Sequence, residues 1–269
     1  MSNQSKEFID AGGRRRSYIH VAPASPQPDA PLLIALHGTS QRGRTMQRFS
    51  GRTLDALAER IGADLVYLNG YGRAWNDARK QKTSRAQKAG IDDVSFVSAV
   101  IDRFSRPAIA VGFSNGGQLV HRILRERPAL LAGAAIIAAG LPVDDDFMLV
   151  GVRPGAIPIL LLHGTADPIV PYGGGRPRML GRPTRGMMQS ARETARSYAP
   201  TGEPATVRDG DVERADWDGV RFITQFGTGH VIPNRITSPG PLAVVGPSHH
   251  DIDLGEEIES FFGLTSQSR

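Results

Sequence analysis

Cysteine is absent from the 269 residues of this sequence. Its absence excludes disulfide bonds, thiolate zinc sites and thiol catalysis. A run of about eighteen apolar residues is also missing, so we expect no membrane-spanning helix. Residues 1–10 are polar and lack the basic and then apolar profile of a signal peptide. We therefore expect a cytoplasmic protein, with a mature secreted form as the open alternative.

Features of nucleic-acid and metal sites are also scarce. The formal net charge is +5 and the sequence pI is about 9.9, but the basic residues are scattered apart from residues 14–16 and the region 73–88. Aromatic residues make up only 6% of the chain and do not interleave with these basic stretches. We expect no nucleic-acid partner and attribute the charge to solubility and a mild attraction for anionic substrates. Histidines and carboxylates at metal-ligand spacing are missing, so we expect neither a metal nor a cofactor.

The order of apolar segments predicts an α/β fold. Strand-length apolar runs alternate with segments that have the apolar spacing of helices, which favours a mainly parallel sheet with helices on both faces. The predicted strands are a hairpin (6–10 and 15–21) and 32–36, 64–68, 107–112, 133–139, 158–163 and 219–226; the predicted helices are 53–61, 93–104, 118–127, 251–262 and one within 183–199. We expect one domain over residues 1–269 with frayed tails at 1–5 and 265–269, and solvated loops at 144–146 and 209–218. The link 141–157 leaves little room for a cap domain.

One motif carries the catalytic hypothesis. Gly112-Phe113-Ser114-Asn115-Gly116 follows a predicted strand and precedes a predicted helix. This is the setting of a nucleophile elbow, in which side chains two residues before and after the serine would crowd the neighbouring strand and helix. A chance match is the alternative, because the chain has 31 glycines. The flanking strand and helix favour Ser114 as a nucleophile.

An acid and a base are expected after the serine, in that order. Asp167 lies just past a predicted buried strand, where a carboxylate can accept the N–H of an imidazole; the alternative is a turn or helix-cap aspartate before Pro168. The base candidate is His230, with His249 and His250 as rivals in the same region. His37 and His163, both at strand ends, are expected to shape their turns.

Two backbone N–H groups are expected to form an oxyanion hole. One belongs to Asn115, directly after the serine, and the other to Thr39 in the loop after strand 32–36, with Ser40 as the neighbouring possibility. Pocket walls are expected from the loops 69–93, 172–184 and 231–247. Possible pocket residues are His37, Trp75 and Tyr172, although a tryptophan packed under the long loop is an equal alternative for Trp75.

Several segments resemble, in order, the motifs of the α/β-hydrolase superfamily: 36–38, 112–117, 163–172 and 229–230. Within it, the chain resembles the polyhydroxybutyrate depolymerase and feruloyl esterase-like group of carbohydrate-esterase type, with further support from residues 16–18, Trp75 and residues 92–97. This resemblance implies an eight-stranded, mostly parallel sheet and a Ser114–Asp167–His230 triad. It also implies ester hydrolysis through an acyl-enzyme.

The leading expectation is thus a cofactor-independent serine esterase that acts on a small-molecule or oligomeric ester, without a nucleic-acid or membrane partner. A thioesterase or an acyl-peptide or amide hydrolase could use the same triad, because acyl transfer underlies each reaction. A non-catalytic binding protein on the same fold is the alternative from another class. The sequence does not determine the oligomeric state.

Overall fold

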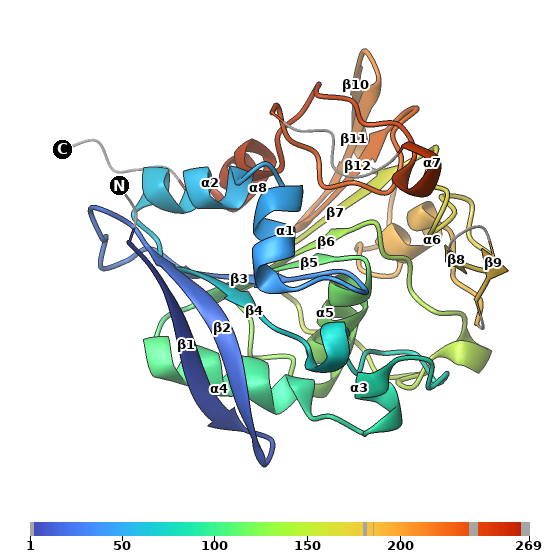
Figure 1. Cartoon of the computed structure of the whole chain (residues 1–269). Coiled ribbons are helices and arrows are strands. Elements are labelled where there is room, and N and C mark those ends of the chain that lie inside the picture. Colours follow the sequence, from blue (N-terminus) through green and yellow to red (C-terminus); the bar gives the residue numbers. More distant parts are fainter. Residues whose placement is uncertain (1–2, 180–181, 185, 237–241, 265–269) are drawn as a thin grey trace.

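A single large β-sheet organises the computed structural model, which describes residues 3–179, 182–184, 186–236 and 242–264 (Figure 1). The sheet has ten strands in the order β1-β2-β4-β3-β5-β6-β7-β12-β11-β10. In chain order the strands are β1 (Asn3–Ala11), β2 (Arg14–Ala22), β3 (Leu32–Leu36), β4 (Leu65–Leu68), β5 (Ala108–Phe113), β6 (Gly133–Ile137), β7 (Ile159–Gly164), β10 (Ala205–Asp209), β11 (Val212–Trp217) and β12 (Val220–Gln225). A separate two-stranded ribbon consists of β8 (Arg178–Met179) and β9 (Arg182–Pro183).

The centre of the sheet is parallel and its margins are antiparallel. Strands β4, β3, β5, β6, β7 and β12 pair in parallel, whereas β1 and β2 on one side and β11 and β10 on the other add antiparallel pairs. The predicted mostly parallel α/β-hydrolase sheet is confirmed, but it is two strands wider than the eight expected. The extra strands, β10 and β11, include most of the segment 209–218, so the prediction of a solvated loop there is wrong. Every residue of β10 is exposed, so this strand lacks the apolar pattern by which buried strands are predicted.

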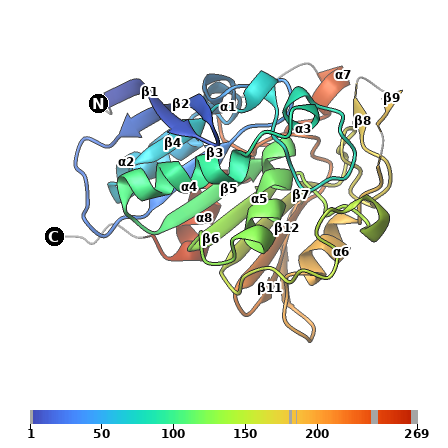
Figure 2. The same cartoon turned by 90° about the horizontal axis from the view of Figure 1, so that it is seen from below.

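Helices cover both faces of the sheet (Figure 2). They are α1 (Gly43–Phe49), α2 (Thr53–Ile61), α3 (Arg85–Lys88), α4 (Asp93–Phe104), α5 (Asn115–Glu126), α6 (Ala191–Arg196), α7 (Leu242–Val245) and α8 (Leu254–Phe262), with short 3-10 helices η1 (Tyr71–Arg73) and η2 (Asp144–Asp146). Helices α4, α5 and α6 pack on one face and α1, α2 and α8 on the other. Side chains alternate along each strand, so Ile34 and Leu36 belong to the first core and Leu33 and Ala35 to the second.

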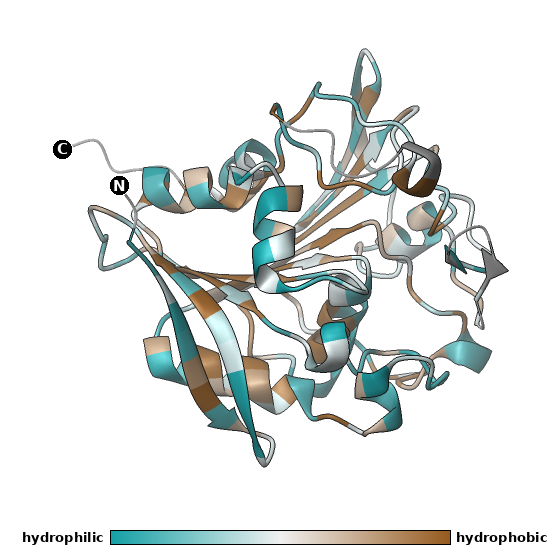
Figure 3. Cartoon of the chain, viewed as in Figure 1, coloured by the Kyte–Doolittle hydropathy of each residue, from teal (hydrophilic) through white to brown (hydrophobic). Residues whose placement is uncertain are grey.

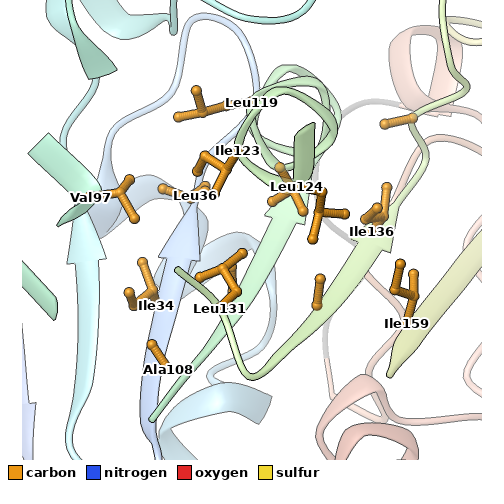
Figure 4. Close-up of a cluster of buried hydrophobic side chains, with 14 of the residues drawn as sticks. Ile34, Leu36, Val97, Ala108, Leu119, Ile123, Leu124, Leu131, Ile136 and Ile159 are labelled. Atoms are coloured by element: carbon orange, nitrogen blue, oxygen red, sulfur yellow. The ribbon is translucent and has the colours of Figure 1, made fainter. Parts of the chain in front are cut away.

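The first core lies between α5 and the sheet. Figure 4 shows Ile123 and Leu124 of α5 above Ile34, Leu36 and Ile136 of the sheet. These side chains are at most 1% exposed. Burial of this size holds α5 firmly on β3 and β5, which fixes the end of β5 against the beginning of the helix.

The ends of several elements follow from local chemistry. The β1–β2 turn has φ angles of 57° at Gly12 and 71° at Gly13, which glycine adopts without strain. Helix α4 starts where predicted, because the side chain of Asp92 accepts a hydrogen bond from the N–H of Ser95. The predicted frayed tail at residues 1–5 is wrong for residues 3–5, which pair with β2. Residues 1–2 and 265–269 lie outside the described part of the chain.

The connections above the carboxyl ends of the strands contain few helices and strands. Between β6 and β7 the chain forms only η2, and between β7 and β10 it forms the β8–β9 ribbon and α6. In the described ranges no cap domain covers the sheet, as predicted. Figure 3 shows the hydrophobic colouring concentrated on the central strands and on the helix faces that meet them. None of the helices described is long and apolar enough to span a bilayer.

Candidate active site

Ser114 sits in a sharp turn between β5 and α5. Its φ of 54° and ψ of −115° are rare for a residue with a side chain. The N–H of Ser114 donates to the carbonyl of Ile137 on the next strand at 2.9 Å, and its carbonyl accepts from the N–H of Gln118 at 3.0 Å. Strand and helix thus hold the strained residue from both sides. Its hydroxyl makes no hydrogen bond within the described residues, so it is available to a ligand.

The two glycines around Ser114 are required by close backbone contacts, as the sequence predicts. A Cβ atom on Gly112 would lie 2.7 Å from the carbonyl oxygen of Gly116. A Cβ on Gly116 would lie only 1.9 Å from the carbonyl oxygen of Leu36. Both distances are far below van der Waals contact, so the elbow can form only with glycine at these positions.

Asp167 lies after β7 and is fixed by four groups. Its Oδ1 accepts hydrogen bonds from the N–H groups of Ile169 and Val170, both at 2.8 Å. Its Oδ2 lies 2.7 Å from Nδ1 of His230 and 3.3 Å from Nε2 of His163. Burial alone would raise the pKa of Asp167, but the charge of His230 and hydrogen bonds from both imidazoles lower it well below the usual range. The carboxylate is therefore ionised at neutral pH.

His230, and neither of its rivals, meets this carboxylate. It follows β12, is 4% exposed and packs its imidazole on the ring of Phe113, with 4.8 Å between ring centroids. Phe113 directly precedes Ser114, so this contact brings the imidazole to the elbow. His250 instead uses Nδ1 to donate to the carbonyl of Asn234, and His249 lies 3.9 Å from Asp251. The structure thus brings Asp167 and His230 together and leaves His249 and His250 apart from them.

The predicted oxyanion donors share a small cavity with Ser114. Thr39, after β3, and Asn115, at the first turn of α5, both line this cavity of about 50 Å³. Ser40 is a poorer donor, because its N–H already bonds to the carbonyl of Arg73 at 2.8 Å. The N–H groups of Thr39 and Asn115 make no backbone hydrogen bond within the described residues. They are thus free to bind an oxygen atom, and the helix dipole favours negative charge there.

A buried polar network fixes Asn115. Its Oδ1 accepts from the N–H of Trp75 at 2.8 Å, and its Nδ2 donates to the carboxylate of Asp77. Asp77 also accepts from Arg79 and from Nε2 of Gln87. The sequence draws attention to residues 75–77 in the loop 69–93 but does not reveal this contact with the elbow. The hydrogen-bond partners of a buried carboxylate are brought to it by the fold, so a local sequence pattern does not reveal them.

The three predicted pocket residues, His37, Trp75 and Tyr172, lie outside the lining of the Ser114 cavity. His37 is fully buried, donates from Nδ1 to the Gly38 carbonyl at 2.7 Å and accepts at Nε2 from the N–H of Gly70 at 3.0 Å. Burial lowers the pKa of His37 to about 4, so the ring is neutral. Trp75 is also fully buried and donates from Nε1 to the His37 carbonyl at 2.7 Å. Both side chains support the loops next to the site, which for Trp75 agrees with the alternative of a tryptophan packed under the long loop.

His163 contacts Asp167, and Tyr172 packs against His163. The hydroxyl of Tyr172 hydrogen bonds to that of Thr224 at 2.8 Å, and its ring meets the His163 imidazole edge to face. His163 donates from Nε2 to the Val170 carbonyl at 2.9 Å, which agrees with the structural role expected for it. The predicted wall loops 69–93 and 172–184 contribute Arg79 and residues 177, 178 and 184 to the lining of the Ser114 cavity, whereas no described residue of 231–247 lines it. The other wall residues include Ala138, Ala139, Ile169, Val170 and Met188. Within the described residues no group of three or more histidines and carboxylates could hold a metal ion.

The order of the strands defines an α/β-hydrolase fold. The nucleophile elbow at Ser114 and the hydrogen-bonded pair of Asp167 and His230 have the layout of a serine hydrolase. The phospholipase/carboxylesterase family model matches residues 20–177. The chain therefore belongs to the phospholipase/carboxylesterase family of α/β-hydrolases. Over 289 aligned residues, which cover 96% of this chain and 81% of the relative, it is 30% identical to a protein of Nocardia uniformis subsp. tsuyamanensis named "Putative esterase NocK".

Further similarities support the same fold. A bifunctional acetylxylan esterase/xylanase of Neocallimastix patriciarum is 29% identical over 166 residues, 57% of this chain and 22% of that protein. The acetyl xylan esterase from Aspergillus awamori superposes with a TM-score of 0.61 at 14% identity, covering 97% of this chain and all of that one. A protein from Thermoplasma acidophilum described as a "predicted CIB-like hydrolase" superposes with a TM-score of 0.56 at 17% identity, covering 98% of this chain and 97% of that one. At these identities the structural matches establish the fold only.

Proposed function

We propose that this esterase-family protein hydrolyses carboxylic esters with a triad of Ser114, His230 and Asp167. The observation that carries the proposal is the 2.7 Å hydrogen bond between Asp167 and His230, beside a serine held at positive φ on a nucleophile elbow. The carboxylate accepts the Nδ1 proton and so leaves Nε2 of His230 free to act as a base. Ser114 makes no hydrogen bond to His230 within the described residues. Catalytic hydrogen bonds of this kind often tighten only when substrate binds.

The reaction then follows from the positions of these groups. Nε2 of His230 takes the hydroxyl proton of Ser114 as its Oγ attacks the ester carbonyl. The carbonyl oxygen becomes an anion, which the N–H groups of Asn115 and Thr39 bind. Collapse of this intermediate breaks the bond to the alcohol, which leaves with the proton from His230. Water, deprotonated by His230, attacks the acyl-enzyme and releases the acid and Ser114.

The cavity beside Ser114 favours a short acyl group. Its volume of about 50 Å³ accommodates a few atoms, and Ala138, Ala139 and Met188 stand in its wall. An acetyl or similar group fits this space better than a long acyl chain. The similarity to an acetylxylan esterase and the resemblance to the polyhydroxybutyrate depolymerase and feruloyl esterase-like group support an oxygen ester of a carbohydrate or related alcohol as the substrate.

Covalent labelling and a substrate panel test this proposal. An aryl phosphonate should add to Ser114, detectable by mass spectrometry of the peptide that contains it, and aryl acetate should be hydrolysed faster than aryl octanoate. Ser114→Ala should abolish phosphonate labelling and lower kcat by about 10⁴-fold or more. The control Ser197→Ala, at the end of α6, should retain the labelling and the kcat of the parent. Faster cleavage of thioesters or aminoacyl anilides than of acetates would favour one of the other acyl-transfer reactions. Full esterase activity in Ser114→Ala would refute the triad.

A further inference from the structure

A second, larger cavity lies apart from the Ser114 site. It has a volume of about 940 Å³ and is lined by the β1–β2 hairpin, by residues 69–73 after β4, and by the residues that open α1 and α3. Its lining and that of the Ser114 cavity share no described residue. We call it the basic groove, and six of its cationic residues form no ion pair within the part of the chain that the structure describes: Lys6, Arg14, Arg15, Arg42, Arg73 and Arg85. Figure 1 shows the hairpin, α1 and α3 on the side of the molecule from which these residues come.

The charge in the basic groove is uncompensated. The described residues that line it include no aspartate or glutamate. Only Arg16 forms an ion pair there, with Asp93 at 2.6 Å, whereas the six cations named above have none within the described residues. Arg14 lies over the ring of Tyr71 at 5.2 Å, and Arg15 over that of Phe8 at 4.4 Å, contacts that hold guanidinium groups without neutralising them. Like charges gathered in a concavity raise the local concentration of anions.

One cation of the basic groove, Arg16, is buried and held by hydrogen bonds. The Arg16 side chain is 4% exposed, and besides Asp93 it contacts the carbonyl of Asn69 at 3.3 Å. The side chain of Asn69 accepts from the N–H of Gly43 at 3.0 Å, which ties the loop after β4 to the start of α1. Gly72 and Arg73 both have positive φ, so the loop turns sharply at the groove. The cations therefore project from a fixed frame formed by separate segments of the chain.

The size and chemistry of the basic groove point to one class of ligand. We propose that it binds a small anion with several phosphate groups, such as an oligophosphate. Guanidinium groups match phosphate oxygens through paired hydrogen bonds, and several of them together balance several charges in a small volume. A cavity of this volume is in the range of small-ligand sites. A membrane surface would require several exposed apolar anchors, and among the described lining residues Tyr71 is the one large apolar side chain.

The site is independent of the proposed esterase reaction but adjoins its machinery. The N–H of Ser40, next to Thr39, donates to the carbonyl of Arg73 at 2.8 Å. The N–H of Gly70 donates to His37 at 3.0 Å, at the end of the strand that leads to Thr39. The loop that lines the groove on one side thus braces the oxyanion loop on the other. Phosphate binding is measurable whether or not the protein cleaves esters.

Binding of tripolyphosphate, measured by titration calorimetry on the full chain in 50 mM salt, tests the proposal. The double variant Arg42→Glu, Arg85→Glu should bind at least about tenfold more weakly, because it loses two charge-assisted contacts and gains repulsion. The control Arg196→Glu, Arg208→Glu has the same change in net charge on α6 and β10 and should bind within about twofold of the parent. Circular dichroism melting should show that both variants are folded. Binding should also weaken as salt rises, since exposed charges are screened.

Four results would overturn the assignment. The first two are equal weakening of tripolyphosphate binding in the control pair and no binding of tripolyphosphate at millimolar concentration. The other two are citrate binding as tight as that of tripolyphosphate, and binding of the protein only to anionic lipid vesicles or single-stranded DNA. If the groove pair melts early, the single variant Arg85→Glu replaces it, since a glutamate at the start of α3 suits the helix dipole. That variant should still weaken binding relative to Arg196→Glu alone. Equal binding by these two would also reject the site.

Discussion

The side-chain amide of Asn115 donates a hydrogen bond to the buried carboxylate of Asp77. This contact joins the nucleophile elbow to a loop 38 residues earlier in the chain. Because the other end of the same amide accepts from the N–H of Trp75 at 2.8 Å, the side chain next to the proposed nucleophile is held on both sides. The backbone N–H that we propose as an oxyanion donor is thereby fixed before substrate arrives, which is what electrostatic stabilisation of a transition state requires.

Removing this amide should impair both stability and turnover. Asn115→Ala leaves the buried N–H of Trp75 without a partner, at a cost of about 1–3 kcal/mol of unfolding free energy. It also loosens the oxyanion donor, so kcat should fall more than KM rises. Urea unfolding and steady-state kinetics on an aryl acetate measure the two effects. The matched control Asn76→Ala removes an amide contact to the Ile91 carbonyl in the same loop and should lower stability while kcat is kept.

Asp167→Asn should inactivate the protein without unfolding it. An asparagine amide keeps the size of the carboxylate but cannot hold His230 in the tautomer that activates a serine, so kcat should fall by about 10⁴-fold. Thermal melting should still show a folded protein. Asp102→Asn, on the outer part of α4, should leave kcat unchanged. Retention of more than a tenth of kcat in Asp167→Asn would indicate that another group orients the base.

Gly116→Ala should prevent the elbow from forming. The added Cβ meets the Leu36 carbonyl oxygen at 1.9 Å, and neither strand β3 nor helix α5 can move away without breaking the first core. We expect a loss of at least about 3 kcal/mol of unfolding free energy or a failure to fold. Gly173→Ala is the matched control, because a Cβ there would meet no heavy atom of the described residues within 4 Å. It should change the unfolding free energy by less than about 0.5 kcal/mol.

Two buried histidines should make the fold sensitive to mild acid. Burial and the charge of Arg125 lower the pKa of His121 to about 3, and burial lowers that of His37 to about 4. Both imidazoles titrate near 6.5 in the unfolded chain, which therefore binds more protons below that pH. Stability contributed by the neutral rings is fully present above pH 6.5 and is lost as pH falls toward 4 and then 3. For His37 alone the full effect is on the order of 3 kcal/mol.

Urea unfolding at pH 7 and at pH 4.5 measures this dependence. The parent should be markedly less stable at the lower pH. His121→Asn should be less stable at pH 7 but lose less stability on acidification, whereas His249→Gln, at a half-exposed position, should follow the parent. A parent unfolding free energy that is the same at both pH values would contradict the account.

The sequence is sufficient to predict the centre of the fold and the β1–β2 margin of the sheet, but not the opposite margin formed by β11 and β10. Strand β3 is a continuous apolar run buried at every position, so its pattern reflects its environment directly. Helix α1 and strands β10 and β11 were not predicted as elements. Helix α1 is short, and β10 is exposed throughout, so pairing with a neighbour rather than burial makes it a strand.

The same distinction holds for the candidate site. Ser114, Asp167 and His230 each follow a buried strand, and the carboxyl ends of parallel strands lie along one edge of the sheet. Their order along the chain was therefore enough to expect them together. Asp77 lies in an irregular loop, and its partners Arg79, Gln87 and Asn115 are brought to it by the path of that loop. The spacing of apolar residues along the sequence carries no information about the path of such a loop.

Both rims of the sheet carry charge along an antiparallel strand. Arg208 and Asp209 are exposed on β10, and Lys6, Glu7 and Asp10 lie along β1. A strand from another molecule that added to either rim would have to face these charges at close range. Fibre growth by strand addition is therefore disfavoured, and the protein should resist aggregation when it is concentrated.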